Sequence, residues 1–215
     1  MDAGLKAAMQ IIPPASFDAA NAEDAHKSKS TAPIRATICM RDQYEQRAHP
    51  IQSSVMLIRK AERRDLDALG RLGAMLMRTH YAFDRERFLA PGEGAESGYA
   101  AFLGSVLDSD DDCVFVAEHD GVVAGYVYVA LEPHSWKELR GPAGFIHDLA
   151  VADDARQSGV GTQLMHAAIG WLRERNAPRV ILWTAAPNGT AQSLFRRLGF
   201  RDTMMEMTLE LPRTS

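Results

Sequence analysis

The chain has 215 residues, of which 46% are hydrophobic and 24% are charged, and its formal net charge at pH 7 is -4. This composition is typical of a globular protein, and the weak acidity argues against a nucleic-acid partner, because nucleic acids bind basic surfaces. Cys39 and Cys113 show neither metal-ligand spacing nor a disulfide pattern, and no apolar run approaches the roughly 20 residues that span a bilayer. We therefore expect a cytoplasmic protein with no bound metal and no association with a membrane.

The first 55 residues differ in composition from the rest of the chain. Pro13 and Pro14 are followed by a stretch rich in Ala, Ser, Asn, Asp and Lys, and no sustained apolar period runs through it. We predict a disordered extension over residues 1–55 and a folded domain over residues 56–212. The extension is interpreted as a flexible tail or as sequence upstream of a true translation start at Met56, with a regulatory or partner-binding arm as the alternative.

The predicted domain begins with three strands and two helices. The first helix is amphipathic and has Asp65 as its candidate N-cap. The second and third strands are joined by Asp120-Gly121, a dipeptide that favours the tight turn of a β-hairpin. The predicted bounds are Met56–Lys60, Cys113–Glu118 and Val122–Leu131 for the strands, and Asp65–Tyr81 and Tyr99–Leu107 for the helices.

The second half of the domain alternates strands with helices. Apolar residues recur at helical spacing from Gly159, and Asn176 and Pro178 end that helix. Asn188 is the candidate N-cap of the next helix, and Gly199 stops it. The predicted strands are Phe145–Val151, Arg179–Thr184 and one or two closing strands within Phe200–Leu211, and the predicted helices are Gly159–Arg175 and Asn188–Leu198. This order of elements predicts an α/β domain with a mixed sheet.

The junction between the Phe145–Val151 strand and its helix carries two glycines, Gly159 and Gly161, within the run Arg156-Gln-Ser-Gly-Val-Gly-Thr162. Free amides at a helix start favour a phosphate, and glycine lets a ligand approach the backbone. A P-loop would need a lysine after its last glycine, and a dinucleotide fingerprint would need a third glycine where Leu164 stands. The pattern therefore predicts a diphosphate site of another kind.

Two motifs carry a resemblance to a known family. The first is Arg156-x-x-Gly159-x-Gly161. The second lies one strand further on and reads Asn188-x-x-Ala191-x-x-Leu194-Phe195-x-x-Leu198-Gly199-Phe200. They resemble the pyrophosphate-binding motif and the C-terminal signature of the GNAT superfamily, the acyl-coenzyme A-dependent N-acyltransferases. The order of elements is also similar to the GNAT fold over Met56–Leu211.

The resemblance implies a GNAT α/β fold in which the strands Phe145–Val151 and Arg179–Thr184 splay apart. It also implies acetyl-CoA as cosubstrate, with its pantetheine arm paired to the open strand edge and its diphosphate held by the glycine loop. The cofactor-binding residues implied in this way are Leu149, Ala150, Val151, Arg156, Gln157, Ser158, Gly159, Val160, Gly161, Thr162 and Asn188.

The implied reaction transfers an acetyl group to a primary amine of a small molecule or peptide, by direct attack in a ternary complex. His147 is the candidate base, because histidine titrates near neutral pH. Strict alternation along the strand would place it on the face of Leu149 and Val151, with Asp148 on the opposite face. Glu118 is the second candidate for the catalytic base. The expected substrate-binding residues are Tyr81, Phe83 and Asp148.

One position departs from the family pattern. Phe195 stands where GNAT members commonly carry a tyrosine whose hydroxyl protonates the departing thiolate, so that role passes to Tyr81, Tyr126, Tyr128 or water. The same departure leaves open a non-catalytic acyl-CoA-binding module of the same fold. A nucleotide-binding regulatory domain is a third interpretation. A homodimer is compatible with the fold, although the sequence predicts no interface.

Overall fold

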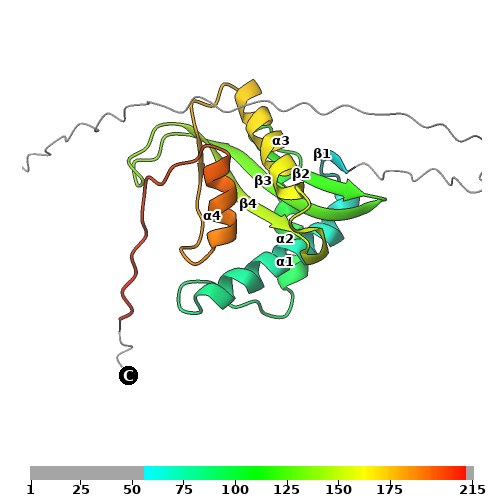
Figure 1. The fold of residues 1–215 in the computed structure, drawn as a ribbon, viewed down its shortest axis with the longest axis horizontal. Helices are drawn as coiled ribbons and strands as arrows, with labels where there is room; N and C mark the ends of the chain where they lie inside the picture. Colours follow the sequence, from blue (N-terminus) through cyan, green and yellow to red (C-terminus); the bar gives the residue numbers. More distant parts are fainter. Residues whose placement is uncertain (1–55, 212–215) are drawn as a thin grey trace, which may run out of the picture. The chain divides into compact units, whose positions relative to one another are not determined.

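The computed structural model describes residues 56–211, in which helices cover both faces of one sheet (Figure 1). The predicted extension over residues 1–55 and the predicted domain end at residue 212 lie outside this range. The elements in chain order are β1 (Leu57–Lys60), η1 (Arg63–Asp65), α1 (Leu66–Phe83), α2 (Ala95–Val106), β2 (Asp112–His119), β3 (Val122–Glu132), β4 (Ala143–Val151), η2 (Asp153–Ala155), α3 (Val160–Glu174), β5 (Val180–Leu182) and α4 (Gly189–Arg197).

The sheet has the strand order β1-β2-β3-β4-β5. The first three pairings are antiparallel, and the pairing of β4 with β5 is parallel. The mixed sheet predicted from the order of elements is therefore confirmed. At the predicted hairpin, Asp120 and Gly121 have φ angles of 50° and 79°, the left-handed conformation that a type I′ turn requires at both central positions.

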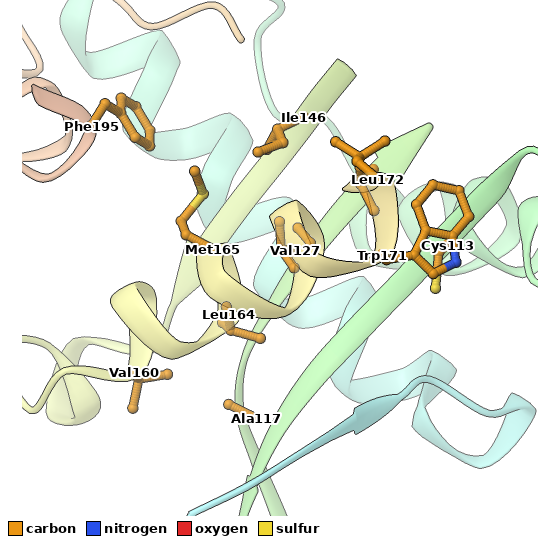
Figure 2. Packing of buried hydrophobic residues seen from close by; sticks show 12 residues of the cluster. Cys113, Ala117, Val127, Ile146, Val160, Leu164, Met165, Trp171, Leu172 and Phe195 are labelled. Carbon is orange, nitrogen blue, oxygen red and sulfur yellow. The ribbon is translucent and has the colours of Figure 1, made fainter. Parts of the chain in front are cut away.

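The helix α3 packs on one face of the sheet with the apolar stripe that its sequence predicts. Leu164, Met165 and Leu172 are fully buried there. Figure 2 shows these side chains directed toward Val127 of β3 and Ile146 of β4, with which they form one apolar cluster. This packing fixes α3, and hence its N-terminus, relative to β4.

The opposite face of the sheet is covered by α1 and α2. Leu69 of α1 and Leu103 of α2 pack with Tyr126 of β3 in a second buried cluster. Gly73 lets the two helices approach closely, because a Cβ at this position would lie 2.1 Å from the ring of Tyr99. That close approach directs Tyr99 of α2 toward the sheet, where it takes part in the site described below.

The helix ends agree with the predicted stop and cap residues in three places. The side-chain oxygen of Asn188 accepts a hydrogen bond from the N–H of Ala191 at 3.2 Å and so caps α4. Asn176 and Gly199, which follow α3 and α4, have φ angles of 56° and 92°, the left-handed conformation typical of helix C-termini.

Asp65 occupies the predicted N-cap position of α1, but the predicted capping by its side chain is wrong. Its side chain makes no capping hydrogen bond to α1 and is instead buried, with only 4% of the residue exposed. Its carboxylate accepts hydrogen bonds from the Arg59 guanidinium at 2.7 and 2.8 Å and from the N–H of Glu62 at 2.8 Å. Burying an unpaired carboxylate costs more free energy than leaving an exposed helix end uncapped. Arg59 supplies the charged partner that the Asp65 carboxylate requires.

The predicted closing strands within Phe200–Leu211 are also wrong for this chain. Residues 201–211 contain no strand, and each of them is exposed. The sequence alternates as a strand would, but in the described part of the chain these residues pair with no other strand. Strand pattern alone is not sufficient, because a strand forms only against a neighbour.

Candidate active site

The loop before α3 presents backbone amides, as its glycines predict. Gln157 and Gly159 have φ angles of 63° and 88°, so the chain turns sharply into the helix. The N–H of Gln163 donates to the carbonyl of Gly159 at 3.1 Å. The three preceding amides, in residues 160–162, have no carbonyl in an earlier turn to bind. Together with the positive end of the helix dipole, they form a site that favours an anion.

The side chains of this loop differ in their availability to a ligand. Arg156 donates through Nε to the carbonyl of Val151 at 3.3 Å and pairs through Nη2 with Asp153 at 2.8 Å. Its side chain is 51% exposed, so the guanidinium can still reach an anion at the loop. The Ser158 hydroxyl donates to the carbonyl of Ala155 at 2.6 Å and is already used within the loop.

Gly161 is not required by the protein's own packing. A Cβ at this position would lie 3.4 Å from Cδ2 of Leu194 and 3.8 Å from Cγ2 of Val151, which are ordinary contacts. An alanine at position 161 would therefore fit inside the fold. Gly159 is different, because its φ of 88° is a conformation that side chains with a Cβ adopt only with strain.

The strands β4 and β5 pair over a short distance and then separate. Three residue pairs join them, from Gly144 with Val180 to Ile146 with Leu182. This limits β5 to three residues, so the predicted strand over Arg179–Thr184 is longer than the one observed. The residues of β4 from Asp148 to Val151 pair only with β3. Their other edge has backbone groups available for an extended, amide-bearing ligand.

A β-bulge interrupts β4 beside this edge. Tyr128 of β3 pairs with Asp148 while the next residue, Val129, pairs with Ile146, so His147 is an extra residue in β4. The predicted alternation through His147 is therefore wrong. His147 and Asp148 both contact tyrosines of the α1 and α2 face, and Leu149 packs on the α3 face.

His147 lies between two aromatic rings. Its imidazole stacks on Tyr128 and on Phe145, with centroid distances of 4.8 and 4.7 Å and interplanar angles of 24° and 22°. Its Nε2 lies 3.2 Å from Oε1 of Glu132, and the side chain is 31% exposed. Burial lowers the pKa of His147, and the nearby Glu132 carboxylate opposes this by raising it. The net lowering favours the neutral imidazole, which can accept a proton.

The partner of His147 was not found from the sequence. Glu132 is the last residue of β3, and its carboxylate also contacts the guanidinium of Arg140. Arg140 further pairs with Glu138 and lies over the ring of Phe145 at 5.8 Å. A glutamate at the end of an apolar strand resembles any solvated end residue, and its backbone partner on β4 is Ala143, so the register alone does not indicate the contact with His147.

Asp148 is held by hydroxyl groups on the α1 and α2 face. The Tyr126 hydroxyl donates to Oδ2 of Asp148 at 3.0 Å, and the Tyr99 hydroxyl is also hydrogen-bonded to this carboxylate. Burial raises the pKa of Asp148, and these two hydrogen bonds and the nearby His147 and His80 partly oppose the shift. A cation beside this buried carboxylate would stabilise its ionised form.

Two of the three tyrosines considered as proton donors are engaged elsewhere. Tyr126 donates to Asp148, and Tyr128 donates to Oδ1 of Asp112 at 2.6 Å. Burial raises the pKa of both hydroxyls. Phe195, at the position of the family tyrosine, is buried in the cluster of α3 and packs edge-on against Phe200.

The structure does not bring Glu118 to His147. Its carboxylate accepts from Nε and Nη2 of Arg59 at 2.8 and 2.5 Å, so it shares this guanidinium with Asp65. It lies on β2, opposite Leu57 of β1, with β3 between β2 and the strand that carries the histidine.

The last turn of α1 carries the two aromatic residues predicted to bind substrate. Tyr81 and Phe83 are half-buried; the Arg85 guanidinium lies over the ring of Tyr81 at 5.7 Å, and Phe83 packs edge-on against His80 at 6.0 Å. Because His80 also acts electrostatically on Asp148, this end of α1 lies near the carboxylate.

Two cavities lie away from this site. One, of about 550 Å³, is bordered by α1 and α2 at Leu66 and Gly104, and the other, of about 360 Å³, lies between the end of α3 and Val180 of β5. Neither is lined by His147 or by the amides of α3. In residues 56–211 no helix has the length and apolar character needed to cross a bilayer, and no three His, Cys, Asp or Glu side chains are arranged to hold a metal.

Comparison with known proteins identifies the family of this chain. The sequence model of the acetyltransferase (GNAT) family matches residues 76–200, which include α3, its loop and α4. The chain belongs to the GNAT family. An N-acetyltransferase of Archaeoglobus fulgidus, described as uncharacterized, is 33% identical over 142 residues, which are 65% of this chain and 89% of that protein.

Other GNAT relatives match over a smaller part of their length. A mycothiol acetyltransferase of Saccharomonospora viridis is 33% identical over 93 residues, and an N-alpha-acetyltransferase of Sulfurisphaera tokodaii is 33% identical over 93 residues. The matches cover 42% and 41% of this chain but only 30% and 56% of those proteins. Their names thus describe proteins that this chain matches in part.

Solved structures share the fold. The BH1408 protein of Bacillus halodurans superimposes with a TM-score of 0.63 at 20% identity, over 73% of this chain and all of that one. Aminoglycoside N-acetyltransferase AAC(6')-Iy, solved in complex with CoA, gives a TM-score of 0.59 at 20% identity, over 75% of this chain and 97% of that one. The α/β GNAT fold predicted from the sequence is confirmed.

Proposed function

We propose that this GNAT protein transfers an acetyl group from acetyl-CoA to a primary amine, with both substrates bound together. The observation that carries the proposal is the arrangement of β4. Its open edge leads to the free amides of α3, and its bulge directs His147 and Asp148 toward the α1 and α2 face. One strand thus offers a donor side and an acceptor side within a few residues.

The donor side fits coenzyme A in three respects. The amides of Val160, Gly161 and Thr162 and the Arg156 guanidinium can bind the diphosphate, and the missing Cβ of Gly161 leaves room for it. The β4 edge at residues 149–151 can pair with the pantetheine amides. Asn188 caps α4 after β5, and its remaining amide donors can reach the same arm.

The acceptor side supports removal of a proton from the amine. Nε2 of His147 faces a carboxylate, which can only accept a hydrogen bond, so Nε2 carries the proton and Nδ1 has the free lone pair. Nδ1 takes one proton from the bound ammonium, which frees the lone pair that attacks the acetyl carbon; as the bond from carbon to sulfur breaks, the second proton lost by the nitrogen passes through water to the departing thiolate. Acetyl-CoA supplies the acetyl group as a thioester, and a backbone N–H near Leu149 stabilises the negative charge on its oxygen.

Asp148 is suited to hold the amine before reaction. A protonated amine beside this carboxylate would offset the cost of its burial, which now raises its pKa. Tyr81 and Phe83, at the end of α1, would contribute aromatic surface to the same cation. This favours a cationic amine, whether it belongs to a small molecule or to a peptide.

A non-catalytic acyl-CoA-binding module is the second candidate. The observation in its favour is that Tyr126 and Tyr128 both donate to carboxylates and that Phe195 has no hydroxyl, so none of them is a free proton donor for the thiolate. The thiolate of coenzyme A is a good leaving group, and water can protonate it. The two candidates share the donor side and differ only in turnover.

The deciding experiment measures binding and turnover on the full chain. Acetyl-CoA at about 100 times its dissociation constant should stabilise the protein by about 2.7 kcal/mol and raise its melting temperature. A panel of primary amines, read by release of free thiol, should then reveal turnover. Stabilisation without thiol release from any amine would favour the binding module, and the absence of stabilisation would contradict both candidates.

A further inference from the structure

The connection between β3 and β4 is held together by Arg140. The N–H of Ser135 donates to the carbonyl of Arg140 at 2.9 Å, and the N–H of Arg140 donates to the carbonyl of Ser135 at 3.1 Å. Nη1 of the guanidinium donates to the carbonyls of Pro133 at 3.0 Å and Gly141 at 3.5 Å. The preceding Leu139 has a φ of 52°, a conformation that a leucine adopts only with strain. In this strained turn the Arg140 side chain is only 13% exposed.

The guanidinium of Arg140 leaves one oxygen of the Glu132 carboxylate for the imidazole. Nη2 of Arg140 binds Oε2 of Glu132, while Oε1 lies 3.2 Å from Nε2 of His147. Nε of Arg140 binds Glu138 at the same time. A planar guanidinium that is fixed by several acceptors restricts the orientation of a carboxylate bound to it. Glu132 is therefore held with a defined oxygen toward His147.

The aromatic neighbours of His147 fix the plane of its ring but not the position of its proton. The imidazole stacks between Tyr128 and Phe145, and both contacts are made by ring faces. Which of the two nitrogens of a neutral imidazole carries the proton depends on the hydrogen bonds in the plane of the ring. At Nε2 that hydrogen bond goes to Glu132, so the tautomer depends on where the carboxylate is held.

We infer that Arg140 is a positioning residue, which holds Oε1 of Glu132 against Nε2 of His147 so that Nδ1 keeps the free lone pair. This role rests on the proposed function, because it concerns the same base. Burial lowers the pKa of His147, and the positive charge of Arg140 lowers it further. Three carboxylates oppose this lowering, namely Glu132 on β3, Asp148 on β4 and Asp112 on β2. Arg140 thus favours both the neutral imidazole and one of its tautomers.

The first test determines the tautomer by nitrogen NMR on the full chain with ¹⁵N-labelled histidines, in which the His147→Gln spectrum identifies the signals of His147. In the unsubstituted chain Nε2 should carry the proton. Arg140→Gln should give a mixture of the two tautomers and should raise the pKa of His147, because a nearby cation is lost. Arg140→Lys keeps the charge but lacks the planar fork, so it should give the same mixture.

Lys137→Gln is the matched control, because it removes the same charge from an exposed side chain of the same connection. It should leave the tautomer and the pKa of His147 at their parent values, and circular dichroism checks that every variant is folded. Protonation of Nδ1 in the unsubstituted chain, or an unmixed Nε2 tautomer in both Arg140 variants, would overturn the inference. The readout needs no turnover, so it decides on Arg140 even for a chain that acetylates no amine.

The second test separates positioning from a merely structural role. At pH 8, Arg140→Gln should lower kcat by about two- to fivefold, the range expected for Glu132→Gln. In a chain that already carries Glu132→Gln, the same substitution should lower kcat no further, because Arg140 acts through Glu132. Equal losses in the two backgrounds would mean that Arg140 only holds the connection together, and would contradict the positioning role.

Discussion

The donor side and the acceptor side of the candidate site are built in different ways. The donor side is local: Arg156, the glycines and the first amides of α3 lie within seven consecutive residues. The acceptor side is assembled from β3, β4, α1 and α2, and it depends on one extra residue in β4. Binding the diphosphate uses backbone geometry, whereas moving a proton requires side chains placed across strands.

This difference separates the effects of substitutions on the two sides. A change in the α3 loop should alter the affinity for acetyl-CoA and leave proton transfer intact. A change beside the bulge should alter turnover or the affinity for the amine and leave acetyl-CoA binding intact. Four substitutions test this separation.

The largest effect is expected at His147. His147→Gln keeps a polar side chain of similar size but removes the group that accepts the proton, so turnover should fall by about 100-fold or more. The dissociation constant for acetyl-CoA, measured by calorimetry, should stay within about twofold of the parent value. Unchanged turnover would remove His147 from the chemistry.

A smaller effect is expected at Asp148. Asp148→Asn keeps the oxygen that accepts from Tyr126 and removes the negative charge, so KM for a cationic amine should rise by about tenfold. The same variant should be more stable at neutral pH. Burial raises the folded pKa of Asp148 above its ordinary 3.8, so its contribution to stability is complete below pH 3.8 and lost as the pH rises through the raised value.

The gain in melting temperature of Asp148→Asn should therefore be small at pH 4 and larger at pH 8. Thermal unfolding of both proteins across this range gives the comparison. A variant that is less stable than the parent at pH 8 would mean that the carboxylate stabilises the fold there.

On the donor side, Gly161→Ala should weaken acetyl-CoA binding by a factor of about 5 to 10, because the added methyl group occupies the space for the diphosphate. The fold should tolerate it, since the nearest atoms would be 3.4 and 3.8 Å away. Gly170→Ala is the matched control: it lies in the same helix, and a Cβ there would meet no atom within 4 Å. Equal affinities of the two variants would contradict the donor site.

The smallest effect is expected at Glu132. Its carboxylate raises the pKa of His147 against the lowering caused by burial, so Glu132→Gln should lower that pKa further. If the neutral imidazole is the base, as we propose, the acidic limb of kcat should move to lower pH, and turnover at pH 8 should fall by only about two- to fivefold. A shift toward higher pH would contradict the assigned pairing.

The sequence predicted the elements and features that depend on neighbouring residues. The Asp120-Gly121 turn, the Asn188 cap and the amide-rich start of α3 are all set within a few positions, and all are present. The interactions between distant residues were not predictable in the same way. Asp65 pairs with Arg59 instead of capping α1, because a buried carboxylate requires a positively charged partner. Helix-capping preferences depend only on neighbouring residues in the sequence and therefore do not indicate that a side chain is buried.

The bulge shows the same limit within a single strand. The pattern of apolar residues in β4 is compatible with a regular strand, and nothing in it marks the residue that β3 does not pair. Once the alternation is shifted, the predicted face of His147 is wrong and its partner Glu132 is missed. Residues 203–211 alternate as a strand would, but within residues 56–211 no strand lies beside them.

The extra residue in β4 has a consequence for how this sheet tolerates change. Before it, Ile146 packs on the α3 face, and after it Leu149 does the same. If His147 were deleted, these residues would fall into one uninterrupted period of two, and each would keep its present face. We therefore expect the sheet to keep its pairing when His147, the residue that we propose as the base, is deleted.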